Sequence, residues 1–242
     1  MASCETRSSP LWMSELRTVA LKNPGNGTWL SNAGLWLIPI SALLLGLHWV
    51  YPSGPRTVEG AARTFASPIT VFVKEFLLFE GGLILLLFGV MVLGGCLAGA
   101  GPRRWGQWAQ ILTMTAVAMF LPGAGIPTAA LPGISDIYLS GHHEVGIVLE
   151  AFIAGHYGAS FVVQFVVLLL VSVAGAVAMA VAGWRSRVIP RWCSIAFPIG
   201  FLLNVTDTPV IAWIGLALML VTGTVIARGF KPKHVREVMA QA

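Results

Sequence analysis

Long apolar runs separated by short clusters of arginine and lysine are the feature that most restricts how this chain can fold. With a mean hydropathy of +0.80 and only 10% charged residues, the chain has too little charge to cover a water-soluble domain. A helix needs about 20 residues to cross about 30 Å of hydrocarbon. The runs predict an all-α, polytopic membrane bundle of six transmembrane helices, at residues 33–51, 72–98, 105–121, 159–183, 192–203 and 210–227.

The basic clusters predict how these helices are oriented. Arginine and lysine collect in the cytoplasmic loops of membrane proteins. Four clusters fall on one side of the predicted bundle: Arg7, Arg17 and Lys22; Arg103 and Arg104; Arg185, Arg187 and Arg191; and Arg228, Lys231, Lys233 and Arg236. We therefore expect both termini in the cytoplasm and the protein in the cell membrane, inner or plasma. The first external loop departs from the rule, because it holds Arg56, Arg63 and Lys74 beside Glu59 and Glu75.

The segments outside the predicted spans are too short to form a second core. We expect a transmembrane domain at 33–228, a cytoplasmic arm at 1–32 and a basic cytoplasmic tail at 229–242. In the arm, residues 11–21 could form an interfacial helix that Pro24, Gly25 and Gly27 end before the membrane. The external segment 122–158 has a first half rich in glycine and proline, which predicts a loop without regular structure. Its second half, from about Glu144, predicts a helix that runs toward the fourth span.

Glu80 is an acidic residue well inside an apolar run, FLLFEGGLILLL. A carboxylate near hydrocarbon needs a partner, a cavity or a function. Two interpretations stay open, a functional acid or a structural partner of Lys74 or of an arginine in the first external loop. Glu75 lies next to Lys74 near the predicted outer interface, where an interfacial ion pair or a solvated charge is expected.

The predicted fifth span is too short to cross the membrane. Its residues 192–203 would extend about 18 Å as a helix, well below the hydrocarbon thickness. The turn that follows, with Asn204, Thr206 and Asp207, should therefore lie below the outer lipid surface, covered by protein or lining a wet cavity. Asp207 could instead cap the sixth helix, which Pro209 would begin.

Other site classes lack their signatures in this sequence. His142, His143 and Glu144, with Asp136, Glu150 or His156, suggest a metal, but their spacing does not place three ligands on one helical face. We expect no metal and no cofactor, because the local motifs of metalloproteases, hydrolases and nucleotide-binding proteins are missing. The net charge of +5 follows from topology, so we expect membrane lipid as a partner and no nucleic acid. Cys4, Cys96 and Cys193 are expected to be structural thiols.

The stretch from Ala154 to Phe197 carries a family resemblance. Here His156, Tyr157 and Gly158 enter the fourth span, and Ser186, Pro190 and Arg191 link it to the fifth. In these features the chain resembles a large family of uncharacterised six-span bacterial membrane proteins, DUF4386. The resemblance covers roughly the C-terminal third and implies a six-span fold without implying an activity. In size and membrane acids the chain is also similar to small integral-membrane terpene cyclases, without a shared motif.

The predicted function is an integral-membrane enzyme for a lipophilic substrate. Acid-initiated cyclisation or isomerisation of a prenyl chain needs a protonated acid, aromatic faces and exclusion of water. The candidate acids are Glu80, Asp207 and Glu150, and the candidate substrate-binding residues are Phe76, Phe79, His156, Tyr157, Asn204 and Trp213. The alternative is a small proton-linked transporter or a non-enzymatic accessory subunit that binds a membrane partner or a second copy. Convergence of the three acids on one enclosed pocket would favour the enzyme.

Overall fold

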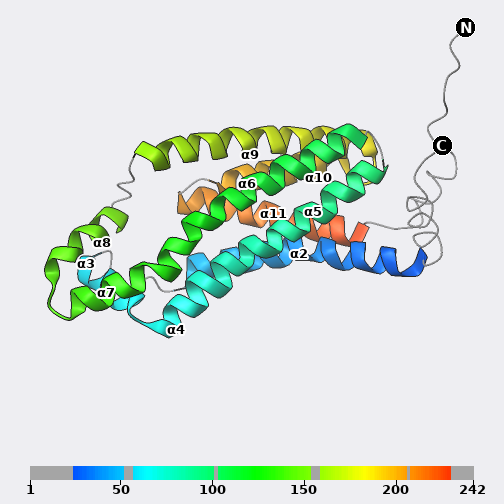
Figure 1. Ribbon diagram of the computed structural model, residues 1–242. Coiled ribbons are helices and arrows are strands. Elements are labelled where there is room, and N and C mark those ends of the chain that lie inside the picture. The colour runs from blue at the N-terminus through cyan, green and yellow to red at the C-terminus, as the bar shows by residue number, and fades with distance from the viewer. Residues whose placement is uncertain (1–23, 52–56, 101–102, 154–158, 206–207, 230–242) are drawn as a thin grey trace, which may run out of the picture.

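The computed structural model describes residues 24–51, 57–100, 103–153, 159–205 and 208–229, and every element in these ranges is helical (Figure 1). The elements in chain order are α2 (Pro24–Val50), α3 (Val58–Phe65), α4 (Pro68–Thr70), the π-helix η1 (Val71–Glu80), α5 (Gly81–Ala100), α6 (Arg103–Ala129), α7 (Leu131–Leu139), the 3₁₀ turn η2 (His143–Val145), α8 (Gly146–Ile153), α9 (Ala159–Ser186), α10 (Arg191–Asn204) and α11 (Pro209–Gly229). The predicted all-α class is confirmed for these residues.

Six long helices form a closed ring. In chain order α2 packs on α5, α5 on α6, α6 on α9, α9 on α10 and α10 on α11, and α11 closes the ring on α2. The interior is filled by apolar side chains such as Leu35, Leu86, Phe197 and Met219, each at most 1% exposed. Short connections favour the antiparallel packing of α5 on α6, α9 on α10 and α10 on α11, whereas α2 and α5, and α6 and α9, are joined through shorter intervening helices.

Every interface of the ring contains a glycine against which the facing helix packs closely. A Cβ atom added at any of these positions would lie 3.0 Å or less from an atom of the facing helix: Gly34, Gly89, Gly94, Gly106, Gly175, Gly183, Gly200, Gly215 and Gly223. At the α10–α11 contact two glycines oppose each other, since a Cβ on Gly200 would meet the carbonyl oxygen of Gly215, and the reverse. Small residues at helix contacts are typical of membrane bundles, where close packing drives association.

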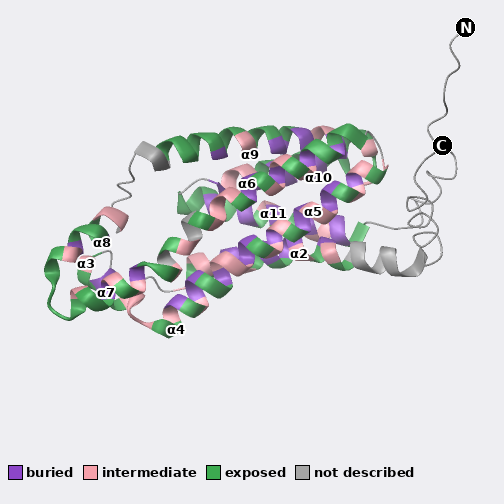
Figure 2. Ribbon diagram, in the orientation of Figure 1, coloured by how far each residue is buried: buried purple, intermediate pink, exposed green. Residues whose placement is uncertain are grey.

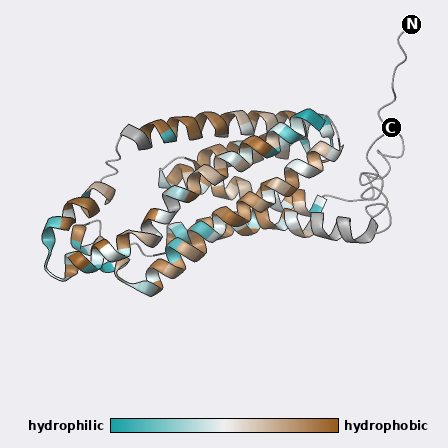
Figure 3. Ribbon diagram, viewed as in Figure 1, coloured by the Kyte–Doolittle hydropathy of each residue, from teal (hydrophilic) through white to brown (hydrophobic). Residues whose placement is uncertain are grey.

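Four stretches are long and apolar enough to cross a membrane: Ala33–Val50, Pro68–Ala100, Val162–Ser186 and Pro209–Gly229. They coincide with the predicted first, second, fourth and sixth spans. Their outer surface is apolar, and Val163, Leu170 and Val177 on α9 are 54–65% exposed (Figures 2 and 3). Such a surface is suited to lipid contact. The third and fifth spans stay predictions, because α6 is less apolar and α10 has only 14 residues.

The described arginines of the basic clusters gather at one end of the ring, where α5, α9 and α11 end and α6 and α10 begin (Figure 1). The guanidinium of Arg185 on α9 lies 6.0 Å from the ring centroid of Trp105 on α6. Arg191 lies 5.3 Å from the ring of Trp184. These cation–π contacts hold the arginines beside tryptophans of the kind that anchor helices at a membrane interface.

A small helical cap, formed by α3, α7, η2 and α8, lies at the opposite end (Figure 1). It has a separate apolar core in which Ala62, Leu131 and Leu149 are at most 1% exposed. The rings of Phe65 on α3 and Phe152 on α8 meet edge to face, with centroids 5.8 Å apart. The cap is attached directly to the bundle, because α3 leads into α4 and η1 and α7 follows α6.

The helix predicted from about Glu144 is present as η2 and α8, but the loop predicted for the first half of the external segment is wrong. The first half of the external segment is helical, because α6 continues to Ala129 and α7 begins at Leu131. Packing of α6 on η1 outweighs the weak helix propensity of its glycines and prolines. Pro24, Gly25 and Gly27 form the first turn of α2, where a missing N–H is tolerated, and whether they end a preceding helix is not tested. The interfacial helix predicted at 11–21 lies outside the described residues.

The shortness of the fifth helix is confirmed. The 14 residues of α10 extend about 21 Å at 1.5 Å per residue. The chain then turns back into α11 at Pro209. The first half of α9 is buried on one face and exposed on the other. Leu168 is buried there, whereas Val166, Leu169 and Leu170 are exposed (Figure 2). This leaves an apolar flank of the bundle open beside the cap.

Candidate functional site

The π-helix η1 is the least ordinary element of the bundle. Its ten residues, Val71–Glu80, form the first part of the Pro68–Ala100 stretch, and its hydrogen bonds are of the i→i+5 type, as between the Gly81 N–H and the Phe76 carbonyl. π-helical turns are rare and are found frequently at functional sites. In this register residues five apart stack on one face, whereas on an α-helix they would lie about 140° apart.

The π register gathers ionisable side chains inside the bundle. Lys74 and Glu75 are 8% and 6% exposed, with the Lys74 Nζ 3.8 Å from the Glu75 Oε1. Glu75 was expected at the interface as an ion pair or a solvated charge. The ion pair is present, but it is buried, and a solvated Glu75 is wrong, because the closed ring takes this face of η1 out of contact with its surroundings. Burying two charges is unfavourable unless each finds a partner.

His48 of α2 completes this face of the site. Its Nδ1 lies 3.2 Å from the Lys74 carbonyl oxygen, and its ring stacks on Phe79 with centroids 4.8 Å apart and planes 23° apart. The hydrogen bond and the stacked ring fix the position of the imidazole relative to η1. Antiparallel packing of α2 on η1 brings these residues together, since His48 lies near the end of its helix and Lys74 near the beginning of its own.

Glu80, the last residue of η1, bonds to α6. The hydroxyl of Thr128 donates to Glu80 Oε1 at 2.5 Å. Both side chains are half-buried, so the carboxyl group is neither sealed in the core nor fully exposed. Thr128 lies in the last turn of α6, in the stretch where a loop was predicted, and the continued helix is what brings its hydroxyl to Glu80.

His48, Lys74, Glu75, Glu80 and Thr128 together are named here the polar cluster. Within it the Lys74 ammonium lies beside the Glu75 carboxylate, and the Glu80 carboxyl group bonds to the Thr128 hydroxyl. From Glu80 to Ala100 the chain rises about 30 Å along α5, which equals the usual hydrocarbon thickness. The polar cluster therefore lies near one boundary of the hydrocarbon when the basic end lies at the other.

The structure brings some of the predicted site residues to the polar cluster. Phe79 contacts His48 directly, and Phe76 stacks on Phe72 with 47% of its surface exposed. Trp213 is 42% exposed, and its ring lies 3.7 Å from the position of a Cβ added at Gly46. Gly46 precedes His48 by two residues, about 200° around α2, so this contact does not place Trp213 in the polar cluster.

Other predicted residues lie apart from it. Glu150 is exposed on α8, which packs on the other cap helices, so Glu150 belongs to the cap. Asn204 ends α10, with its backbone against Gly215 of α11. Asp207, His156 and Tyr157 lie outside the described residues. Whether Asp207 meets Glu80, as was expected of the three acids, is therefore not tested.

Sequence reasoning missed His48 and Thr128 as site residues. For His48 a signal existed, because it and Lys74 fall near adjoining ends of consecutive antiparallel helices. For Thr128 no signal existed, because it lies in a stretch whose composition predicts a loop.

The histidines of the cap make only local contacts. The His142 Nδ1 lies 3.2 Å from the Glu144 Oε1, and both side chains are at least 66% exposed. The His143 ring meets Tyr138 edge to face. Within the described ranges, no three histidine, cysteine, aspartate or glutamate side chains gather closely enough to hold a metal ion.

Comparisons of the chain with protein-family models, with curated proteins and with solved structures give no match. The resemblance to six-span proteins of the DUF4386 family stays a prediction. Inference about function therefore depends on the chemistry of the polar cluster.

Proposed function

We propose that the protein is a six-span integral-membrane enzyme that uses Glu80 as a general acid on a lipophilic, isoprenoid-type substrate at the outer boundary of the hydrocarbon. In this proposal both termini are cytoplasmic and the protein resides in the cell membrane. The observation that carries the proposal is the half-buried Glu80 carboxyl group, bonded to Thr128 within the stretch Pro68–Ala100 that is apolar enough to cross a membrane. Ionisable groups within apolar stretches that can cross a membrane are functional candidates by default.

The chemistry needs no cofactor. Glu80 gives its proton to a carbon–carbon double bond, and the electron pair of that bond forms the new C–H bond and leaves a carbocation. Loss of a proton from a neighbouring carbon to the Glu80 carboxylate then forms a shifted double bond. In a cyclisation, a second double bond of the chain first attacks the cation, its electron pair forms the ring C–C bond, and the proton is lost from a carbon beside the new cation. In both cases the product is an isomer of the substrate. The Thr128 hydroxyl stabilises the Glu80 carboxylate between the two steps, and the faces of Phe76 and Phe79 favour a nearby cation.

The exposed apolar flank supports entry of such a substrate from the lipid. The short α10 leaves the first part of α9 uncovered beside the cap, and its exposed side chains include Val163, Val166 and Leu170. A lipophilic molecule can approach along these side chains without crossing water.

A proton-linked transporter is the second candidate, and the buried Lys74–Glu75 pair favours it, since such pairs are typical of proton pathways in membranes. Transporters, however, bind their coupling ions near the bilayer midplane. Glu80 lies about 30 Å along the helix from Ala100, about twice the distance expected of a midplane site. An accessory subunit, the third possibility, would require no coupling among these charges.

Isotope incorporation tests the enzyme. Membranes containing the full chain would be incubated with isoprenoid hydrocarbons and alcohols in deuterium oxide, and the products analysed by mass spectrometry. An acid-initiated isomerisation places one solvent deuterium on carbon, so a product isomer heavier by one mass unit is expected. Glu80→Gln should slow its formation about 10²- to 10⁴-fold, the usual contribution of a general acid. Thr128→Val should slow it about ten- to a hundredfold, as for loss of a hydrogen bond to a charged group.

Glu59→Gln is the matched control, because Glu59 is an exposed carboxylate of the cap, paired with Arg63. It should leave turnover unchanged. All variants must first elute from detergent size exclusion like the unmodified chain. Equal turnover by Glu80→Gln and Glu59→Gln, or no deuterated isomer from the unmodified chain, would contradict the proposal. Proton uptake by sealed proteoliposomes, in the absence of product, would favour the transporter.

A further inference from the structure

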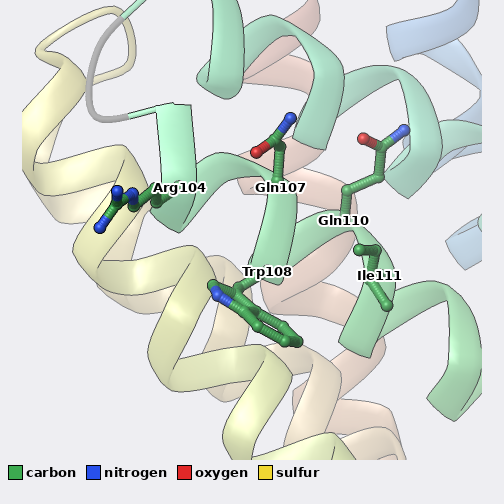
Figure 4. A pocket seen from close by; sticks show the side chains of 5 residues that line it. All are labelled: Arg104, Gln107, Trp108, Gln110 and Ile111. Carbon is green, nitrogen blue, oxygen red and sulfur yellow. The ribbon is translucent and has the colours of Figure 1, made fainter. Parts of the chain in front are cut away.

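A pocket of about 420 Å³ lies at the basic end of the bundle, far from the polar cluster. It is lined by side chains from the first turns of α6: Arg104, Gln107, Trp108, Gln110 and Ile111 (Figure 4). The 20 residues from Trp108 to Thr128 extend about 30 Å along α6. The pocket is therefore not part of the site that contains Glu80.

The lining of the pocket changes from charged to apolar along the helix. Arg104 is in the first turn of α6, Gln107 and Trp108 follow, and Ile111 lies about 10 Å further along. Trp108 and Ile111 are 56% and 55% exposed. The amide of Gln110 donates to the Met91 carbonyl of α5 at 3.0 Å, so this wall of the pocket is fixed to the neighbouring helix.

The electrostatics of this end favour an anion. Arg103, Arg104, Arg185, Arg187, Arg191 and Arg228 are the described charged side chains here. The described carboxylates lie in the cap or in η1: Glu59, Glu75, Glu80, Asp136, Glu144 and Glu150. Arg185 and Arg191 lie over tryptophan rings, whereas Arg104 lines the pocket.

We propose that this pocket binds the headgroup of an anionic phospholipid. The phosphate lies against the Arg104 guanidinium and the Gln107 amide, the Trp108 indole lies at the level of the glycerol, and an acyl chain follows Ile111. This order, from cation through amide and indole to aliphatic, matches the order of groups along a phospholipid. All the lining residues belong to α6, and basic residues at the end of a membrane helix are known to attract anionic headgroups. A soluble phosphate would leave the exposed Trp108 and Ile111 without an apolar partner.

Lipid retention by the full chain in detergent tests this site. The protein would be titrated with phosphatidylglycerol or with phosphatidylcholine of the same acyl chains, and bound lipid counted by native mass spectrometry. Phosphatidylglycerol should bind more tightly, and Arg104→Gln should weaken its binding about fivefold, the usual effect of one basic residue near an anionic lipid surface. Trp108→Ala should weaken both lipids without changing the preference for the anionic one.

Arg103→Gln is the matched control, since Arg103 precedes Arg104, is exposed and does not line the pocket. It should change phosphatidylglycerol binding less than twofold. Equal losses in Arg103→Gln and Arg104→Gln would overturn the site in favour of general attraction to a basic surface. Displacement of phosphatidylglycerol by inorganic phosphate at millimolar concentration would overturn the lipid assignment and indicate a soluble phosphate ligand. These measurements involve no turnover, so they stand apart from the test of Glu80.

Discussion

Replacing Gly215 by alanine should destabilise the bundle, although alanine has the higher helix propensity. A Cβ atom at this position would lie 2.7 Å from the Gly200 carbonyl oxygen, 2.8 Å from the Asn204 backbone nitrogen and 2.9 Å from the Leu203 Cβ. Two of these three atoms belong to the backbone of α10, which cannot rotate away as a side chain can. The two helices must therefore move apart along their contact.

The expected loss follows from overpacking. Inserting a methyl group into a well-packed contact destabilises by about 1–3 kcal/mol, against a gain of about 1 kcal/mol from replacing glycine in a helix. Because two of the atoms met are backbone atoms, we expect the overpacking cost to lie at the upper end of this range, which leaves a net destabilisation of about 1–2 kcal/mol. Gly200→Ala meets the same gap from the other side, at 2.9 Å from the Gly215 carbonyl oxygen. Once the helices have separated, the second methyl group adds little, so the double variant should lose less than the sum of the two.

Thermal unfolding in detergent, followed by helical circular dichroism, measures the effect. Gly95→Ala is the control, because Gly95 is exposed on α5 and a Cβ there would have no atom within 4 Å. It should be as stable as the unmodified chain or slightly more stable. If Gly215→Ala unfolds at the same temperature as Gly95→Ala, or if the double variant is fully additive, the close contact of α10 and α11 does not exist as described.

Three further predictions concern the polar cluster, the cap and the orientation. Lys74→Met alone should destabilise the folded protein by about 3–5 kcal/mol in a detergent unfolding assay, because it leaves Glu75 charged and buried. The double variant Lys74→Met, Glu75→Gln should recover most of that loss, and equal stability of the single and double variants would contradict a buried pair. Leu149→Ala should destabilise the cap core by about 2–5 kcal/mol, so a protease should cleave the cap of the folded protein faster while the bundle unfolds at an unchanged temperature. A lower unfolding temperature of the bundle would show that the two cores are not separate. A cysteine introduced at Ser140, which is exposed after α7, should react with an impermeant maleimide on intact cells, and a cysteine at Arg187 should react only after lysis. The reverse pattern would show that the cap faces the cytoplasm and the basic end faces outward.

Much of the fold could be predicted because it depends on local sequence. Hydrophobic runs predict where chains cross lipid, and the four stretches able to do so agree with predicted spans. The short α10 follows from counting apolar residues before Asn204. Glu80 attracts attention because a lone carboxylate in an apolar run is conspicuous without any knowledge of its neighbours.

The partners of Glu80 could not be predicted in the same way. An α-helical period would place Glu75 and Glu80 about 140° apart, whereas the π register of η1 brings them to one face. Thr128 lies in a stretch rich in glycine and proline, which predicts a loop until packing on η1 is considered. For His48, the sequence places it and Lys74 near adjoining helix ends, but the contact between them joins two helices and is seen only in the structure.

The sequence by itself determined which stretches are apolar enough to cross a membrane and where the basic residues collect, because transfer of each segment into lipid depends mainly on the composition of that segment. Only the tertiary structure decided that the six helices close into a ring through glycine contacts, that η1 winds as a π-helix and that α6 continues to reach Glu80. These outcomes depend on contacts between residues far apart in the chain, whose packing energies outweigh local preferences.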